Sequence, residues 1–254
     1  MANALENQVA IITGSTSGMG EGIARRFAKE GASVVINGTN EERGKAIQAS
    51  INDEGGKASF YKADVSEAAE VESLVQFAVE QFGKVTILVP NAGILGNGSA
   101  TDLPLETWHK TIGVNLNGVY YLCRFGLPEL IKAGGGTVVI NASIASFKGF
   151  PNHPAYCASK GALIPLMKNL AKDYAEHKIR VNALCPGPVD TPLIWDSVKA
   201  FPNPDSIVDE TVQMTCMKRL GTPTDVAKAA LFFASDASSW ITGSALVIDG
   251  GVMC

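Results

Sequence analysis

The chain has 254 residues, of which 46 % are hydrophobic and 18 % are charged, and its formal net charge is −4. One hydrophobic core can organise a chain of this length, so we expect a single domain over residues 1–254. The charges form no basic block and no apolar run approaches the roughly 20 residues that span a bilayer, which excludes a nucleic-acid-binding protein and a membrane-spanning one.

The N-terminal segment and the cysteines indicate a cellular compartment. The start, MANALENQ, lacks the basic residues and the apolar run of a signal peptide. The five cysteines are odd in number and have neither CxxC nor Cys/His spacing, so we expect packing residues and no disulfide framework. We therefore expect a cytoplasmic protein without a bound metal.

Short β-branched segments alternate with longer helical patterns along almost the whole chain. This alternation is typical of βαβ units, and it predicts an α/β fold, a Rossmann-like doubly wound sheet of about seven parallel strands with helices on both faces. We predict strands at residues 9–13, 33–37, 58–64, 85–91, 136–143, 179–186 and 244–249.

The first predicted strand leads directly into TGSTSGMG, residues 13–20, and then into a helical pattern. Gly14, Gly18 and Gly20 allow a tight turn and let backbone N–H groups approach a pyrophosphate. The spacing TGxxxGxG differs from GxGxxG. Its position between a strand and a helix near the N-terminus nevertheless predicts a dinucleotide-binding site.

The second predicted strand ends at Asn37-Gly38-Thr39-Asn40. A dinucleotide site usually has an Asp or Glu near this point, which binds the adenosine ribose and excludes a 2′-phosphate. No acid stands here, and no Arg or Lys does either, while the glycine turn offers Ser17 where a cation would help. Asn37 and Thr39 can hydrogen-bond either form of the ribose. Because a phosphate without a cation binds poorly, we favour NAD(H) and leave NADP(H) open.

Tyr156 and Lys160 lie four residues apart in a helical pattern, NHPAYCASKGAL. Residues at this spacing share one helix face, so both side chains can reach the same cleft. A free phenol has a pKa of about 10, and a nearby ammonium group lowers it. Alcohol oxidation needs a base on the hydroxyl and ketone reduction needs an acid on the oxygen, so one tuned tyrosine can serve both directions.

The segment from Gly187 to Gly221 interrupts the alternation of strands and helices. It contains many prolines and no clear strand, and it is longer than an ordinary connection. Long loops in compact domains are usually functional. We therefore interpret residues 187–221 as a lid over the substrate.

Together these motifs resemble those of the short-chain dehydrogenase/reductase family. The motifs that occur in the family's order are the glycine turn, Asn91-Ala92-Gly93, Asn115 in VNLNGVY, Ser143 in INASIAS, the Tyr156/Lys160 pair, PGPVDT at residues 186–191 and the ending ITGSALVIDGG. The resemblance covers essentially the whole chain. It implies an NAD(P)-dependent oxidoreductase that interconverts a secondary alcohol and a ketone.

The resemblance also implies a role for each matched residue. Tyr156 would be the general acid/base, and Lys160 would lower its pKa and bind the nicotinamide ribose. Ser143 would hold the substrate oxygen, and Asn115 would support a water-linked proton path behind Lys160. The cofactor-binding residues that the motifs and the family predict are Gly14, Ser17, Gly18, Met19, Gly20, Asn37, Thr39, Asp64, Val65, Asn91, Ala92, Gly93, Tyr156, Lys160, Pro186, Gly187, Val189 and Thr191.

Two prolines depart from the family's pattern. Pro90 stands where the family usually has Asn, which removes a backbone donor at the exit of the fourth strand. Pro165 falls inside the predicted catalytic helix and should kink it. In the family that helix packs between subunits, so we expect a homotetramer or a homodimer and leave its geometry open.

The substrate pocket is predicted from residues around the catalytic positions. It comprises Leu95, Ser143, Ile144, Phe150, Leu193 and Trp195, with Phe147 beside them, and this largely apolar set favours a hydrophobic ketone or secondary alcohol. The turn STSG and the NG after the second strand resemble the hydroxybutyrate dehydrogenase branch, which binds a carboxylate with polar and basic side chains. This chain has Leu95, Ala145 and His153 at those positions, and only His153 can help to bind an anion.

Three other functions stay open. A sugar or polyol dehydrogenase and a 3-oxoacyl reductase are the alternatives among enzymes, although no basic cluster suggests docking of an acidic carrier protein. A non-catalytic dinucleotide sensor is the alternative from another class. Such a sensor would not need the complete set of Ser143, Tyr156 and Lys160.

Overall fold

A computed structural model describes residues 3–198 and 203–254, and its sheet has seven strands in the order β3-β2-β1-β4-β5-β6-β7. The strands are β1 (Val9–Ile12), β2 (Ser33–Gly38), β3 (Lys57–Lys62), β4 (Ile87–Val89), β5 (Gly136–Asn141), β6 (Ile179–Pro186) and β7 (Ala245–Ile248). All neighbouring strands pair in parallel. The predicted doubly wound parallel sheet is confirmed.

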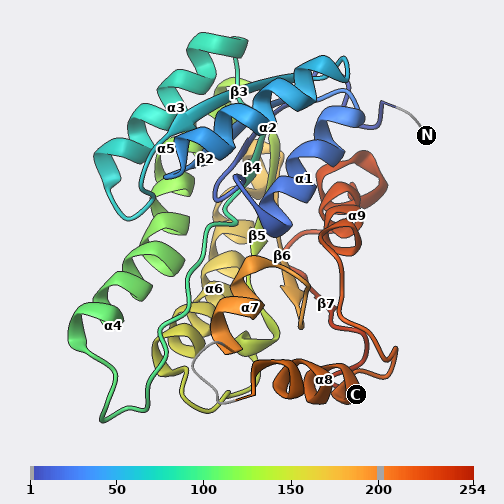
Figure 1. Ribbon diagram of the computed structural model, residues 1–254. Helices are drawn as coiled ribbons and strands as arrows, with labels where there is room; N and C mark the ends of the chain where they lie inside the picture. Colours follow the sequence, from blue (N-terminus) through green and yellow to red (C-terminus); the bar gives the residue numbers. More distant parts are fainter. Residues whose placement is uncertain (1–2, 199–202) are drawn as a thin grey trace.

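Helices fill the connections between the strands (Figure 1). They are α1 (Gly18–Lys29), α2 (Glu41–Asp53), α3 (Ala68–Phe82), α4 (Leu105–Ile112), α5 (Gly118–Lys132), α6 (Pro154–Asp173), α7 (Pro192–Val198), α8 (Pro204–Met214) and α9 (Pro223–Ala234). A π-helical turn, Gly113–Asn117, joins α4 to α5. In the part of the chain that the structure describes, no helix is both long and apolar enough to cross a membrane.

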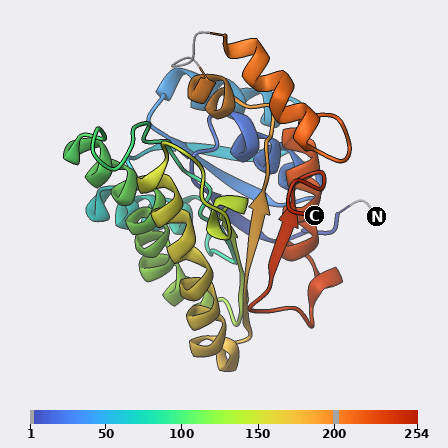
Figure 2. The same ribbon diagram turned by 90° about the horizontal axis from the view of Figure 1, so that it is seen from below.

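The sheet lies between two layers of helices, as Figure 2 shows from below. Successive residues of a strand point to opposite faces, so each central strand supplies both cores. Ile11 enters the core formed with α3, α5 and α6, whereas Ala10 and Ile12 enter the core formed with α1, α2 and α9. Because both faces are buried, the two strands at the middle of the sheet, β1 and β4, are apolar at every position.

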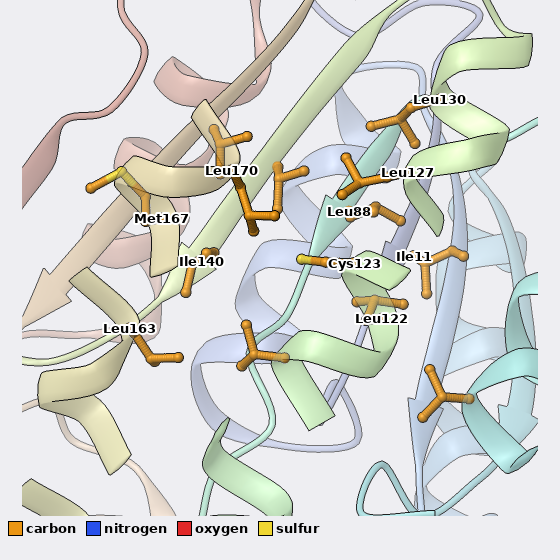
Figure 3. Close-up of a cluster of buried hydrophobic side chains, with 14 of the residues drawn as sticks. Ile11, Leu88, Leu122, Cys123, Leu127, Leu130, Ile140, Leu163, Met167 and Leu170 are labelled. Carbon is orange, nitrogen blue, oxygen red and sulfur yellow. The ribbon is translucent and has the colours of Figure 1, made fainter. Parts of the chain in front are cut away.

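Figure 3 shows the core beneath α5 and α6. The labelled side chains come from α5 (Leu122, Cys123, Leu127, Leu130), from α6 (Leu163, Met167, Leu170) and from the strands (Ile11, Leu88, Ile140). Full burial of one such aliphatic side chain stabilises a fold by about 1.5–3 kcal/mol. This packing holds α6, which carries Tyr156 and Lys160, rigidly against the sheet.

The strand order reverses direction at β1, which lies between β2 and β4. In open parallel sheets, ligands bind beyond the carboxyl ends of the strands at such a switch point. Here the backbone N–H of Asn91, after β4, donates to Thr13 Oγ1, after β1, at 3.0 Å, although the two residues are 78 positions apart. The sheet thus brings the glycine turn and the Asn91-Ala92-Gly93 segment side by side.

The predicted lid, residues 187–221, contains α7 and α8, and its residues 199–202 lie outside the described residues. Figure 1 shows both helices beyond the sheet, on the side to which the chain leaves β6. An isolated parallel bridge between Val189 and Gly221 joins the start of the segment to its end. Pro165 does not divide α6, which continues through it as one helix, and Pro128 lies inside α5 in the same way.

Candidate active site

A cleft of about 520 Å³ opens at the carboxyl ends of the strands, around the glycine turn. Most of the predicted cofactor-binding residues line it: Gly14, Ser17, Gly18, Met19, Gly20, Asn37, Thr39, Asp64, Val65, Asn91, Ala92, Gly93, Tyr156, Lys160 and Thr191. The two ends of the predicted site, the glycine turn and the Tyr–Lys pair, therefore belong to one continuous cleft.

Three predicted cofactor residues, Pro186, Gly187 and Val189, are not among the described residues that line the cleft. Pro186 ends β6 and is aligned with Ile248 of β7. The backbone N–H of Gly187 donates to Ile248 O at 2.9 Å, and Val189 is buried. These contacts hold the loop that leads to Thr191, which does line the cleft.

The glycine turn fits a dinucleotide because no side chain can stand there. A Cβ on Gly20 would lie 2.3 Å from Gly14 O and 2.5 Å from Asn91 Nδ2. Gly14 has a φ of +61°, and its Cβ would lie 2.7 Å from Ala92 Cα. The bare backbone leads into the N-terminus of α1, where the helix dipole favours a negatively charged pyrophosphate.

Gly20→Ala is expected to weaken cofactor binding at least about tenfold and to lower the free energy of unfolding by about 1–3 kcal/mol. The new methyl group would overlap the backbone oxygen of Gly14, which cannot rotate away. Fluorescence titration with NADH and NADPH measures the first effect, and urea denaturation measures the second.

The matched control for this prediction is Gly161→Ala in α6, where an added Cβ meets no other atom within 4 Å. This change should leave cofactor binding unaltered and stabilise the helix by about 0.5–1 kcal/mol. If Gly20→Ala bound the cofactor as tightly as the control, the glycine turn would not be the cofactor site.

Ser143, Tyr156 and Lys160 come together from two parts of the chain. Ser143 follows β5 and begins a 3₁₀ turn, where its Oγ accepts from the N–H of Ala145 at 3.1 Å. Tyr156 and Lys160 lie one turn apart on α6, with the Lys160 ammonium 5.9 Å from the centre of the Tyr156 ring. The Ser143 side chain also interacts with Tyr156, where it favours a lower pKa of the phenol. The predicted hydroxyl, phenol and amine are thus neighbours.

Burial changes the protonation of both groups on α6. Burial raises the pKa of Tyr156, and the interaction with Ser143 opposes that rise. Burial also lowers the pKa of Lys160 to about 8. The Lys160 ammonium group donates to Asn141 O at 2.8 Å. At neutral pH, Tyr156 is therefore a phenol and Lys160 is largely an ammonium ion.

Asn115 lies in the π-helical turn between α4 and α5, an irregularity that is frequent at functional sites. Its Oδ1 accepts from the Ile94 N–H at 2.8 Å, and its Nδ2 donates to Ile94 O at 2.9 Å and to Ser159 Oγ at 3.1 Å. Asn115 thus ties the loop after β4 to α6. A Cβ on Gly93 would lie 3.5 Å from both Asn115 Oδ1 and Lys160 Nζ, so the glycine leaves space between these two groups.

A buried amide pair beneath the glycine turn was missed by sequence reasoning. Asn91 Nδ2 donates to Thr13 O at 2.8 Å and to Gly14 O at 3.1 Å, and Asn91 Oδ1 accepts from Asn141 Nδ2 at 2.8 Å. Because Asn141 O accepts from Lys160, Asn141 links the glycine turn to the lysine. Its position as the last residue of β5 is the signal that could have indicated it.

Other lining residues were also absent from the prediction. They are Thr16, Gly38, Arg43, Ala63, Ile94, Lys110, Val114, Ala142, Pro192 and Asp196. Arg43 lies in the first turn of α2. It is just beyond the stretch from Asn37 to Asn40, which contains no Arg or Lys. A basic residue near the end of β2 that the sequence pattern did not reveal therefore lines the cleft.

Asn37 and Asp64 have structural partners of their own. The Asn37 amide donates to Tyr61 O at 3.3 Å and Ala63 O at 3.1 Å, and its buried Oδ1 has no partner among the described residues. Asp64 Oδ1 accepts from the N–H and Oγ–H of Ser66 at 2.9 and 2.7 Å. Both side chains hold strand ends in place, and their contacts with a cofactor stay predictions.

The predicted substrate pocket is only partly represented in this cleft. Leu193 lines it, whereas the described residues Leu95, Ser143, Ile144, Phe150 and Trp195 do not. The Trp195 indole N–H donates to Asp190 Oδ1 at 2.7 Å, and His153 Nδ1 lies 2.6 Å from Pro151 O. These two polar groups are occupied within the protein. The described residues also include no cluster of three or more metal-ligating side chains.

A doubly wound sheet with a glycine turn at its switch point, and a half-buried tyrosine and a buried lysine in the same cleft, define a dinucleotide-dependent oxidoreductase. A family model described as Enoyl-(Acyl carrier protein) reductase matches residues 14–253. The chain belongs to the short-chain dehydrogenase/reductase family, as its motifs predicted. It is an oxidoreductase that acts on CH–OH groups, and the family uses NAD(P)(H).

Similar proteins include characterised dehydrogenases. The chain is 39 % identical to a 2,5-dichloro-2,5-cyclohexadiene-1,4-diol dehydrogenase of Sphingobium indicum, over 99 % of this chain and 98 % of the relative. It is also 39 % identical to a cyclohexanol dehydrogenase of an Acinetobacter species, over 98 % and 96 %. The ligand-free structure of Thermoplasma acidophilum aldohexose dehydrogenase matches it with a TM-score of 0.90 and 31 % identity, over 100 % of this chain and 96 % of that one.

Proposed function

We propose that this enzyme interconverts a secondary alcohol and a ketone where Ser143, Tyr156 and Lys160 meet. The observation that carries the proposal is the position of Tyr156, which interacts with Ser143 and lies one helical turn from Lys160 in the cleft. NAD(P)(H), when bound, supplies the acceptor or donor of the hydride. The side chains of the protein then have to hold the substrate oxygen and move one proton.

Each of these side chains has a proposed task. In oxidation, the phenolate form of Tyr156 takes the proton of the alcohol O–H as the hydride leaves the carbon for the cofactor, and in reduction the phenol form gives its proton to the ketone oxygen. Ser143 Oγ donates a hydrogen bond to the substrate oxygen. Lys160 holds the nicotinamide ribose and favours the phenolate form of Tyr156 when it turns toward the cofactor. Asn115 supports a proton path through the space that Gly93 leaves open.

The substrate that we propose is a fairly apolar cyclic secondary alcohol or the corresponding ketone. Two relatives of 39 % identity are named for cyclohexanol and for a chlorinated cyclohexadiene diol. The predicted pocket residues Leu95, Ile144, Phe150, Leu193 and Trp195 are apolar, which agrees with such a substrate. A sugar or polyol is the second candidate, because the similar solved structure is an aldohexose dehydrogenase.

The experiment is a panel of cyclic alcohols, aldohexoses, polyols and hydroxy acids, followed by absorbance of the reduced cofactor. We expect kcat/KM for cyclohexanol-type substrates to exceed that for sugars by at least about tenfold, since an apolar wall leaves sugar hydroxyls without partners. A preference for aldohexoses would favour the second candidate. Activity with none of the classes would contradict the proposed reaction.

The remaining features of the chain fit this proposal. We propose a single domain in which residues 187–221, with α7 and α8, cover the substrate.

We also propose a homotetramer or homodimer, because Trp240 is 99 % exposed and Leu246 and Val247 are exposed on β7, an edge strand. A reducing compartment such as the cytoplasm agrees with the five unpaired cysteines.

A further inference from the structure

Arg43 stands where two hollows of the surface meet. One is the cofactor cleft, and the other, of about 620 Å³, adjoins it on the outer side of the glycine turn. Both are lined by Thr16, Ser17, Gly18, Arg43 and Pro192. The backbone N–H of Arg43 donates to the capping side chain of Asn40 at 2.9 Å, so the first turn of α2 is held beside the end of β2.

The Thr16 side chain occupies the place of the usual ribose-binding acid. A Cβ on Gly38, the last residue of β2, would lie 2.8 Å from both Oγ1 and Cγ2 of Thr16. An Asp or Glu there would have to displace Thr16. The carboxylate that in many dinucleotide sites repels a 2′-phosphate is therefore absent, and a threonine hydroxyl occupies the space.

The hydroxyl groups around Arg43 are available to a ligand. Within the described residues, Thr16, Ser17 and Thr39 have no side-chain hydrogen bond, and Ser17 occupies the N-cap position of α1 without capping it. The hydroxyl groups of these three residues and the guanidinium group of Arg43 form a set of donors that matches the oxygens of a phosphate.

Several of the other charged side chains that line these two hollows already have partners within the protein. Arg25 pairs with Glu21 at 2.9 Å and donates to Ser50 Oγ at 2.9 Å. Asp190 accepts from the Trp195 indole N–H at 2.7 Å. Among the described residues, the Arg43 guanidinium has no acidic partner, so its charge is not neutralised by the protein.

We infer that Arg43, with the hydroxyls of Thr16, Ser17 and Thr39, binds the 2′-phosphate of NADP(H), and that this chain prefers NADP(H) to NAD(H). The inference deepens the proposed function and rests on its dinucleotide site. It reverses the expectation drawn from the stretch Asn37 to Asn40, because the cation arrives from α2, three residues beyond that stretch. A planar guanidinium can donate two parallel hydrogen bonds to a phosphate.

The test uses two fragments that differ only in the 2′-phosphate, namely 2′,5′-ADP and 5′-AMP, in calorimetric titrations without substrate. The natural chain should bind 2′,5′-ADP at least about tenfold more tightly than 5′-AMP, as expected for a charge-assisted contact. Arg43→Ala should reduce this ratio to within about twofold of unity, and Arg43→Lys should keep part of it. The same order should appear for NADPH against NADH.

Lys45→Ala is the matched control, since it removes one positive charge from the same helix at a side chain that pairs with Glu41. It should leave the ratio unchanged. Equal binding of both fragments by the natural chain, an unchanged ratio in Arg43→Ala, or an equal fall in Lys45→Ala would each overturn the inference. Failure to bind either fragment would instead contradict the dinucleotide site on which the proposed function rests.

Discussion

Tyr156→Phe is expected to lower kcat for every accepted substrate by about 10²–10⁴-fold, the usual contribution of a positioned general acid or base. The substitution removes only the phenol oxygen, which Ser143 contacts and which would exchange the proton with the substrate. Binding of the cofactor should change by less than about twofold, because the ring and its packing on α6 are retained. Steady-state kinetics and cofactor titration measure the two effects.

The pH dependence gives this prediction a second readout. Burial raises the pKa of Tyr156, so at neutral pH the phenol holds its proton. The rate of ketone reduction should therefore not vary with pH near neutrality. The rate of alcohol oxidation should increase as the pH rises and the phenol ionises. Tyr156→Phe should remove the rise in oxidation rate.

Tyr120→Phe is the control for the loss of a phenol group, because Tyr120 is exposed on α5. It should leave kcat and the pH profile unchanged. Turnover by Tyr156→Phe equal to that of the control would contradict the assignment of Tyr156 as the general acid/base.

Lys160→Met is expected to reduce kcat/KM at least about a hundredfold, since it removes the ammonium group that would bind the ribose and support ionisation of Tyr156. The same change should not weaken the fold as an ordinary core substitution does. Lys160 is only 3 % exposed, and burial lowers its pKa from 10.5 to about 8. Holding the charge in the fold at pH 7 therefore costs about 3 kcal/mol.

The effect of Lys160→Met on stability combines two terms. The variant avoids the cost of the buried charge but leaves Asn141 O without its 2.8 Å hydrogen bond, a loss of about 1–3 kcal/mol. We expect the variant to be about 1 kcal/mol more stable than the natural chain at pH 7, as measured by urea denaturation.

The pH dependence of this difference follows from the lowered pKa of Lys160. Between pH 8 and 10.5 the unfolded chain binds a proton at this lysine that the folded chain has released, so the natural fold gains stability as the pH rises. The advantage of Lys160→Met should therefore shrink from pH 8 to pH 10. A pH-independent advantage, or one that grows, would mean that Lys160 is not a desolvated cation.

Lys168→Met tests whether the loss of a charge on α6 is enough to cause these effects. Lys168 is exposed on the same helix. This variant should retain kcat/KM.

The sheet could be predicted closely from local patterns. Each predicted strand overlaps an observed one, because both faces of a parallel sheet are buried and its strands appear as short continuous β-branched runs. The residues at which strands begin and end were predicted less accurately than the strands themselves. The fourth strand, expected over 85–91, is confined to Ile87–Val89, and Pro90, which follows it, cannot donate a ladder hydrogen bond.

The site could be predicted where its residues belong to contiguous motifs. The glycine turn, the Asn91-Ala92-Gly93 segment and the Tyr156/Lys160 pair were identified because a turn or a helix holds their parts in a known local geometry. All three contribute residues to the lining of one cleft. Pro186, Gly187 and Val189 belong to such a motif as well, yet they support the cleft and do not line it. Nearness along the chain did not decide which way the loop faces.

The sequence by itself was thus enough to predict the reaction class, hydride transfer, and the doubly wound sheet. It also predicted that Tyr156 and Lys160 lie one helical turn apart. Only the folded chain decides which distant groups become neighbours. Asn91 bonds to Asn141, Lys160 turns to Asn141 O, and Arg43 reaches the cleft beside Thr16. These contacts join residues far apart in the chain, and their distances depend on the packing of strands and helices, which no local pattern records.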